Sequence, residues 1–88
     1  MEITYDPEAD ALYILLHDAE PKDSTDIEEG VLVDLDKHGR IVGVEVLDAS
    51  DRLTPEELAT VSYENLVTGA RDTARIETSR PAAAESKT

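Results

Sequence analysis

This sequence contains no cysteine, no phenylalanine and no tryptophan. Without cysteine the chain has no disulfide framework, no thiolate nucleophile and no cysteine-based zinc site. Its aromatic residues are three tyrosines, so its core must be built from leucine, valine, isoleucine and those tyrosines. A core this thin in a chain of 88 residues favours a homodimer, because a second copy can bury apolar surface that one copy leaves exposed.

The chain also lacks a long apolar run and has few positive charges. No stretch approaches the roughly 20 apolar residues that cross a bilayer. Glu2 and Asp6 stand in the N-terminal region where a signal peptide carries positive charge, so we expect a cytoplasmic protein without membrane contact. The net charge is −13, and residues 1–66 carry 18 acidic against 4 basic residues, a net charge of −14. This charge disfavours direct nucleic-acid binding and permits a basic protein partner, although solubility alone also explains it.

The strongest structural signal is a predicted β-hairpin in the middle of the chain. Residues 31–35 and 41–47 are rich in β-branched side chains, which suit pleated strands. Residues 36–39, with the sequence DKHG, separate these two runs. The Asp36 carboxylate can accept hydrogen bonds from backbone N–H groups two residues on, and Gly39 tolerates positive φ. This pattern predicts a type I turn closed by a left-handed glycine.

The turn also predicts how the two strands pair. A three-residue loop between Asp36 and Arg40 pairs Leu35 with Ile41. Alternation along the strands then gives two faces: Val31, Val33, Leu35, Ile41 and Leu47 on one, and Leu32, Val42, Val44 and Val46 on the other. Because both faces are apolar, we expect this sheet to be covered on both sides.

The segments before this hairpin predict a second one. Residues 2–5 alternate and residues 11–16 are apolar, so both read as strands, with a proline-containing turn at 6–10 between them. Residues 17–29 are polar, acidic and interrupted by a proline. We therefore expect a loop there, or at most a frayed strand around 24–28.

A helix is predicted after the central hairpin. Thr54 suits the N-cap position, Pro55 the first helical position, and Glu57 stands three residues after the cap. Together they form a capping box. We expect the helix to end near Thr60 or Val61, after which the chain runs extended.

These elements predict an α+β fold. It consists of a small antiparallel sheet of about four strands, arranged as two consecutive β-hairpins, followed by one short helix. We assign residues 1–69 to this domain. Residues 70–88, in which Ile76 is the only large apolar side chain, are expected to form a flexible C-terminal tail, because so polar a segment cannot offset the entropy of ordering.

No motif in the sequence assigns a reaction. Asp6, Glu8 and Asp10 alternate as in a calcium loop, but Ala11 and His17 stand where that loop requires Gly and Glu. A glycine-rich phosphate loop and a recognisable nucleophile setting are also missing. We therefore expect no cofactor, no bound metal and no catalytic activity. The alternative is a metal-dependent or hydrolytic enzyme that uses surface carboxylates, with Asp6, Asp10, Asp34 or Asp36 as the candidates.

Several segments resemble one known family. They are YDPEADALYI at 5–14, EGV at 29–31, Asp34, GRIVG at 39–43 and EVLDAS at 45–50. Over roughly residues 1–53 the chain is similar to the uncharacterised small bacterial and archaeal proteins grouped as domain-of-unknown-function family 2283. The resemblance implies a small domain of antiparallel strands and supplies no activity, cofactor or catalytic residue. Gly43 in this pattern indicates a bulge or a close approach, and we expect Tyr5 or Tyr13 to pack over it.

The leading functional hypothesis is a non-catalytic protein-interaction module that forms a homodimer. Its sharper version is an antitoxin-like or inhibitory partner of a basic protein, a role associated with families of small acidic proteins. The acidic segment between the two hairpins supplies the expected docking strip: Asp18, Glu20, Asp23, Asp26, Glu28 and Glu29. Electrostatic steering would make such binding weaken as salt rises.

Overall fold

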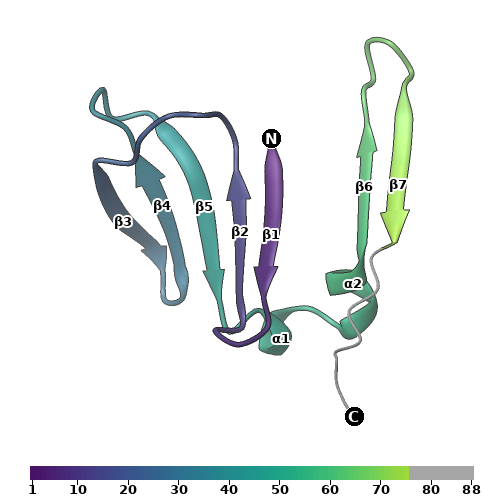
Figure 1. Ribbon diagram of the computed structural model, residues 1–88, viewed down its shortest axis with the longest axis horizontal. Coiled ribbons are helices and arrows are strands. Elements are labelled where there is room, and N and C mark those ends of the chain that lie inside the picture. Colours follow the sequence, from purple (N-terminus) through teal and green to yellow (C-terminus); the bar gives the residue numbers. More distant parts are fainter. Residues whose placement is uncertain (76–88) are drawn as a thin grey trace. The chain divides into compact units, whose positions relative to one another are not determined.

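The computed structural model describes residues 1–75 of the chain (Figure 1). The chain divides into two compact units, one spanning Met1–Arg52 and one beginning at Leu53. Each unit contains its own antiparallel sheet, and two short helices complete the described part of the chain. This architecture agrees with the predicted α+β class in its coarse form. It contains more strands than the four expected and two helices where one was expected.

The first unit is built on a five-stranded antiparallel sheet. Its strands are β1 (Glu2–Asp6), β2 (Ala11–Leu15), β3 (Asp23–Glu28), β4 (Val31–Leu35) and β5 (Ile41–Leu47). Their order across the sheet is β1-β2-β5-β4-β3 (Figure 1). The two predicted hairpins, β1–β2 and β4–β5, are present. Pairing between β2 and β5 joins them into one sheet.

The segment 17–29, expected to be a loop, contains the edge strand β3. This strand pairs with β4, and a bulge at Ile27 interrupts the pairing between Asp26 and Glu28. Every residue of β3 is exposed. The strand is therefore held by its backbone hydrogen bonds to β4 and not by burial of its side chains. That explains why apolar alternation does not reveal it. Its charge and its bulge are features that keep an edge strand from pairing with foreign strands.

The predicted turn between β4 and β5 is confirmed. Gly39 has a left-handed φ of 78°, and its N–H donates to the Asp36 carbonyl oxygen over 3.0 Å. The Asp36 carboxylate accepts hydrogen bonds from the N–H groups of His38 at 2.8 Å and Arg40 at 2.9 Å. These contacts hold the pKa of Asp36 below its ordinary value, with the Arg40 N–H as the main cause. The ionised form of Asp36 therefore stabilises this turn.

A β-bulge in β5 changes the predicted pairing. Leu35 pairs with Ile41 as predicted, but Asp34 then pairs with Gly43, which leaves Val42 as the extra residue. Beyond the bulge every partner is shifted by one position, and a shift of one residue moves side chains to the opposite face. Val42 is completely buried.

The shifted register gives the sheet one apolar face and one mixed face. The apolar face carries Ile3, Tyr5, Leu12, Ile14, Val31, Val33, Leu35, Val44 and Val46, and the edge strand β3 adds Asp23, Thr25 and Glu28 to it. The mixed face carries Ala11, Tyr13, Leu15, Leu32 and Leu47 together with the carboxylates of Glu2, Asp6, Asp26, Asp34 and Glu45. The expectation of a sheet that is apolar on both faces is therefore wrong.

Two short helices follow the sheet along the chain. The first, α1 (Ala49–Arg52), comes directly after β5 and lies at one end of the sheet (Figure 1). Ala49 is completely buried. This helix was not predicted, because four residues are too few to show a periodic pattern. No helix within residues 1–75 is long and apolar enough to cross a membrane.

The second helix, α2 (Pro55–Ala59), opens the second unit and has the predicted capping box. The N–H of Glu57 donates to the Thr54 hydroxyl at 3.1 Å, and the N–H of Thr54 donates to the Glu57 carboxylate at 2.8 Å. The helix ends at Ala59, one residue before the earlier of the two predicted ends.

A two-stranded sheet completes the second unit. β6 (Thr60–Glu64), in the segment expected to run extended, pairs with β7 (Arg71–Arg75). β7 lies within the segment expected to be a flexible tail, so that expectation is wrong for residues 71–75. Polar cross-strand contacts such as the 3.1 Å hydroxyl pair of Ser62 and Thr73 explain why no apolar pattern predicts it. The remainder of the expected tail, residues 76–88, lies outside the described residues.

Candidate functional site

The antiparallel topology gathers three acidic connections at one end of the five-stranded sheet. The β1–β2 turn, the β3–β4 turn and the β5–α1 connection all lie where β1, β3 and β5 finish (Figure 1). They bring together the carboxylates that we call the acidic end: Asp6, Glu8, Asp10, Glu28, Glu29, Asp48 and Asp51. Only the fold brings these residues together, because they come from three separate parts of the sequence.

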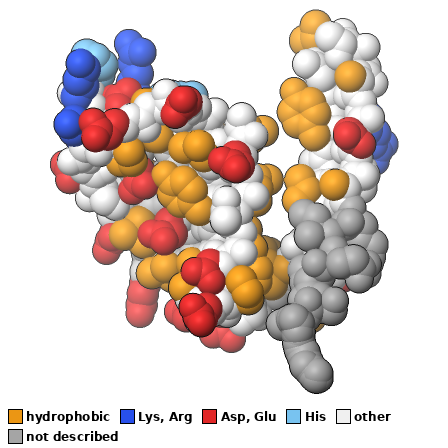
Figure 2. Space-filling model, viewed as in Figure 1, with side chains coloured by type: hydrophobic (Ala, Val, Ile, Leu, Met, Phe, Trp, Pro, Cys, Tyr) orange, Lys and Arg blue, Asp and Glu red, His pale blue; other side chains and the backbone are white. Residues whose placement is uncertain are grey.

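Positive charge lies mostly at the opposite end of the same sheet. Within residues 1–52 the basic side chains are Lys22, Lys37, Arg40 and Arg52. The first three lie before β3 and in the β4–β5 turn, away from the acidic end. Figure 2 shows basic side chains gathered over the β4–β5 turn and acidic side chains over the rest of the sheet. Arg52 is thus the one basic residue that this unit places at the acidic end.

Asp10 organises the interior of the acidic end. Its backbone is left-handed, with φ 52°, and its carboxylate accepts hydrogen bonds from the Tyr5 hydroxyl at 2.7 Å and from the Ser50 hydroxyl at 2.7 Å and N–H at 3.0 Å. Its carbonyl oxygen also accepts from the N–H of Ala49 at 3.0 Å. The Ser50 hydroxyl, and then that of Tyr5, hold the pKa of Asp10 below its ordinary value. This aspartate therefore ties the β1–β2 turn to α1.

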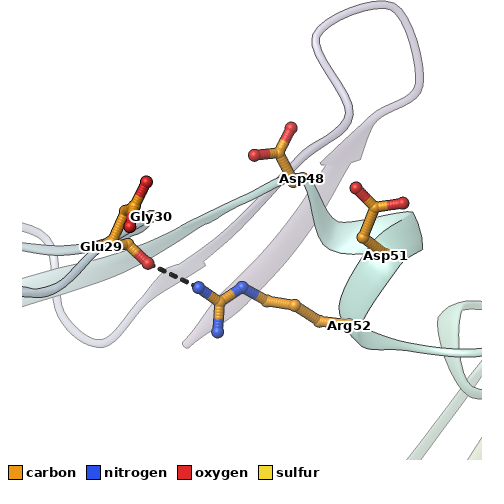
Figure 3. A pocket seen from close by; sticks show the side chains of 5 residues that line it. All are labelled: Glu29, Gly30, Asp48, Asp51 and Arg52. Carbon is orange, nitrogen blue, oxygen red and sulfur yellow. Dashed lines mark hydrogen bonds between the residues drawn. The ribbon is translucent and has the colours of Figure 1, made fainter.

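A pocket of about 300 Å³ opens between the β3–β4 turn and α1, lined by Glu29, Gly30, Asp48, Asp51 and Arg52. Figure 3 shows the Arg52 side chain reaching toward Glu29, with the carboxylates of Asp48 and Asp51 to one side. Gly30 has a φ of 84°, and a Cβ there would lie 3.0 Å from Nη2 of Arg52. Glycine at this position therefore leaves room for the guanidinium group. Three of the lining residues are acidic and one is basic, so the lining of the pocket carries a net negative charge.

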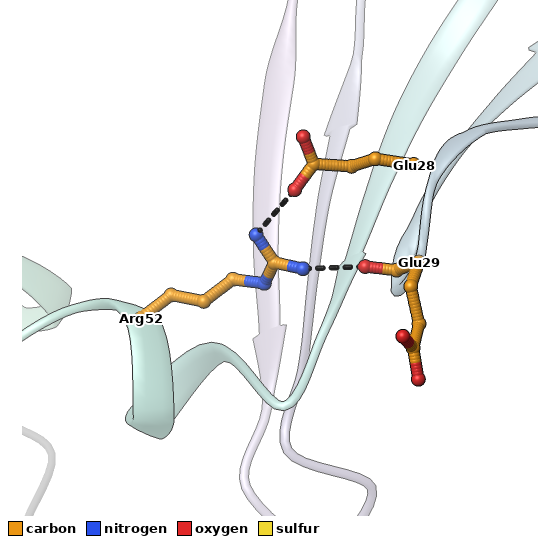
Figure 4. A network of polar contacts seen from close by, with 3 residues as sticks. All are labelled: Glu28, Glu29 and Arg52. Carbon is orange, nitrogen blue, oxygen red and sulfur yellow. Dashed lines mark hydrogen bonds and ion pairs between the residues drawn. The ribbon is translucent and has the colours of Figure 1, made fainter.

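Arg52 links α1 to the β3–β4 turn through two contacts (Figure 4). Its Nη1 lies 3.0 Å from the Glu28 carboxylate, and its Nη2 donates to the Glu29 carbonyl oxygen at 2.6 Å. The side chains of Arg52 and Glu28 are 36% and 61% exposed. An ion pair this exposed is screened by water and salt and contributes little to stability.

A comparison with known protein families matches the segment that contains most of the acidic end. A family model described as protein of unknown function (DUF2283) matches residues 2–50, more than half of the chain. This chain belongs to the DUF2283 family. The predicted resemblance is confirmed, and the matched segment includes all five strands of the first sheet and the Tyr5–Asp10–Ser50 contacts. No curated protein matches the chain, and no solved structure matches it.

The predicted docking strip lies wholly inside the DUF2283 segment and follows β3 and its two connections. All six of its residues are exposed: Asp18, Glu20, Asp23, Asp26, Glu28 and Glu29. The first three lie toward the opposite end of the sheet, which we call the basic end because it carries Lys22, Lys37 and Arg40. There Glu20 pairs with Lys22 at 3.4 Å. The last two belong to the acidic end. Asp48 and Asp51 also lie at this end and were not predicted to belong to the strip. They follow β5 in the sequence, and only the strand order shows that the end of β5 lies near the β3–β4 turn.

The four carboxylates of the enzyme alternative are not gathered in one place. Asp6 accepts hydrogen bonds within its own turn, and Asp36 lies in the turn at the opposite end of the sheet. Asp34 lies on the mixed face and accepts a 2.8 Å hydrogen bond from Tyr13, whose pKa is raised by burial and by this contact. Within the part of the chain that the structure describes, no group of three or more acidic or histidine side chains could hold a metal ion.

Proposed function

We propose that this DUF2283 protein is a non-catalytic interaction module that docks a basic protein through the acidic end of its five-stranded sheet. The observation that carries the proposal is the gathering of seven carboxylates from three connections at one end of the sheet, where this unit has a single basic side chain. An antitoxin-like or inhibitory role fits this arrangement, since a partner's basic surface would be covered while the complex lasts.

The pocket at the acidic end suggests how a partner is recognised. Its volume of about 300 Å³ is enough for one lysine or arginine side chain, and Asp48 and Asp51 supply carboxylate acceptors beside it. Arg52 already makes a guanidinium contact of this kind, with the Glu28 carboxylate and the Glu29 carbonyl oxygen. A partner's cationic side chain would add a second one. The net charge of −13 would speed the encounter at low salt.

The test begins with affinity capture of the full chain from a lysate of its source organism at low salt, followed by mass spectrometry. Binding of the recovered basic protein is then measured with two matched double variants. Glu29→Gln with Asp51→Asn removes two charges from the acidic end, and Asp18→Asn with Glu20→Gln removes two charges near the basic end. We expect the first pair to weaken binding at least about tenfold, and the second pair to change it little.

Two results would contradict this proposal. Equal weakening by both double variants would mean that net charge, and no particular surface, governs the association. Affinity that stays unchanged between about 50 mM and about 500 mM salt would remove the electrostatic basis of docking.

The non-catalytic part of the proposal has its own test. Calorimetric titration of the full chain with Mg²⁺, Mn²⁺, Ca²⁺ and Zn²⁺ should give no binding heat and no shift in melting temperature. The support is that the candidate carboxylates Asp6, Asp10, Asp34 and Asp36 are spread over the sheet. Heat from one of these ions, lost in Asp6→Asn or Asp34→Asn, would favour the metal-dependent enzyme instead.

A further inference from the structure

We infer that the apolar face of the five-stranded sheet is a self-association surface, which pairs with the same face of a second copy of this chain. The inference goes beyond docking of a basic partner, because it concerns another surface and an uncharged contact. The apolar side chains of this face come from β1, β2, β5 and β4.

Most of this face is not buried within the chain. Val33 is 4% exposed, but Ile3 is 41% exposed, and the other side chains of the face are only half-buried. The helix of the same unit, α1, has four residues and lies at the end of the sheet (Figure 1). It is too short to cover strands that span the width of a sheet. A continuous apolar surface of this kind usually marks an interaction site.

Charge favours a second copy as the occupant. On β1, β2, β5 and β4 the apolar face carries no ionised side chain, whereas the mixed face carries the four carboxylates of Glu2, Asp6, Asp34 and Glu45. The edge strand β3 adds Asp23 and Glu28 to the apolar face at one side. Two copies of a chain with net charge −13 repel one another wherever their carboxylates meet. They can approach closely through the four uncharged strands of this face, and in a two-fold contact the same patch of each copy meets the other.

Other occupants fit this face less well. A basic partner is attracted to carboxylates, and this face offers none on its four apolar strands.

The size of the face sets the expected strength of the dimer. Four strands spaced about 4.8 Å apart, with about five residues each rising about 3.3 Å, have a projected area of roughly 300 Å². Specific interfaces bury about 800 Å² per partner, so a contact through this face alone is small. We therefore expect a weak dimer, with a dissociation constant of micromolar or above. Two sheets would stack face to face about 10 Å apart, with both acidic ends exposed.

The first measurement is the mass of the full chain in solution, by light scattering and sedimentation velocity, from about 1 µM to about 200 µM. We expect a concentration-dependent rise from 9.6 kDa toward twice that mass. Raising salt should strengthen the dimer, because it screens repulsion between acidic copies and favours apolar contact. A monomer throughout this concentration range at both low and high salt would overturn the inference.

Two matched pairs of variants locate the surface. Ile3→Lys lies on the apolar face and Leu47→Lys on the mixed face, at positions that are 41% and 36% exposed. Ile14→Lys and Leu15→Lys are half-buried neighbours on β2 that face opposite ways. We expect Ile3→Lys and Ile14→Lys to weaken the dimer at least about tenfold, and the mixed-face variants to leave it within about twofold.

Circular dichroism of each variant checks that it remains folded. If the half-buried variants at Ile14 and Leu15 unfold, the exposed variants at Ile3 and Leu47 still test the surface. Equal effects of Ile3→Lys and Leu47→Lys, or a larger effect of Leu47→Lys, would overturn the assignment to the apolar face. The two proposals separate by salt, since docking of a basic protein weakens as salt rises and this dimer strengthens. Either can therefore fail without the other.

Discussion

Tyr13 packs over Gly43, and its hydroxyl donates a 2.8 Å hydrogen bond to Asp34. A Cβ on Gly43 would lie 2.6 Å from Cζ of Tyr13 and 3.0 Å from the carbonyl oxygen of Ile14. Of the two tyrosines expected at this position, Tyr13 is therefore the one found there. The requirement for glycine is steric, because the ring crosses from β2 over β5 to reach β4.

The first prediction follows from this close approach. Gly43→Ala should lower the free energy of unfolding by about 1–3 kcal/mol, because the added methyl group forces the Tyr13 ring away. Urea unfolding measures this loss. In a Tyr13→Leu background the same substitution should cost clearly less, since leucine lacks the atoms that the methyl group meets. Strict additivity of the two substitutions would show that the ring is not the cause.

The second prediction concerns Asp10, which joins the β1–β2 turn to α1 at the acidic end. Asp10→Asn retains a side chain that tolerates the left-handed backbone. It removes the negative charge and replaces one of the two oxygens that accept from Tyr5 and Ser50 by an NH2 group, which cannot accept. We expect a lower urea midpoint and weaker attachment of α1. Asp48→Asn is the matched control, since its φ of 53° is also left-handed. If the control loses as much stability as Asp10→Asn, backbone conformation rather than the hydrogen bonds would be responsible.

Stability should depend on pH through the same aspartates. Asp10 and Asp36 have pKa values below the ordinary 3.8 in the folded chain, because donors stabilise their ionised forms. The unfolded chain therefore takes up protons first as pH falls. The stabilisation they provide is complete well above pH 3.8 and is lost as pH falls below it, toward the folded pKa values. NMR titration of the carboxyl groups should show both lowered pKa values. An ordinary pKa for Asp10 would mean that Tyr5 and Ser50 do not stabilise its ionised form.

A fourth prediction separates two exposed ion pairs. Arg52→Gln removes the contacts with Glu28 and the Glu29 carbonyl oxygen, and should cost up to about 1 kcal/mol of unfolding free energy at low salt. Lys22→Gln removes a 3.4 Å pair with Glu20 and should have almost no effect. Urea unfolding at low and high salt measures both. A larger loss from Lys22→Gln would mean that the basic end, and not the link to α1, is the more important contact.

The local features of this fold were predictable from short stretches of sequence. Asp36 and Gly39 indicated the β4–β5 turn, and Thr54 with Glu57 indicated the start of α2. Each of these signals acts through hydrogen bonds within about four residues, so no knowledge of distant partners is needed to interpret them.

Strands without an apolar pattern were not predictable in this way. β3 is exposed along its whole length, and β7 pairs with β6 through contacts such as that of Ser62 and Thr73. Backbone hydrogen bonds to a neighbouring strand define both elements, and such bonds leave no periodic trace in the side chains.

The sequence by itself determined the turns, the helix cap and the DUF2283 segment, because these depend on neighbouring residues and on motif spacing. The tertiary structure alone decided which residues share a face and which share an end. The bulge at Val42 shifts the pairing of β5 by one position, which brings Val44 and Val46 to the same face as Val33 and Val31. The strand order then brings Glu29, Asp48 and Asp51 together, since antiparallel pairing places turns that are distant in sequence at the same end.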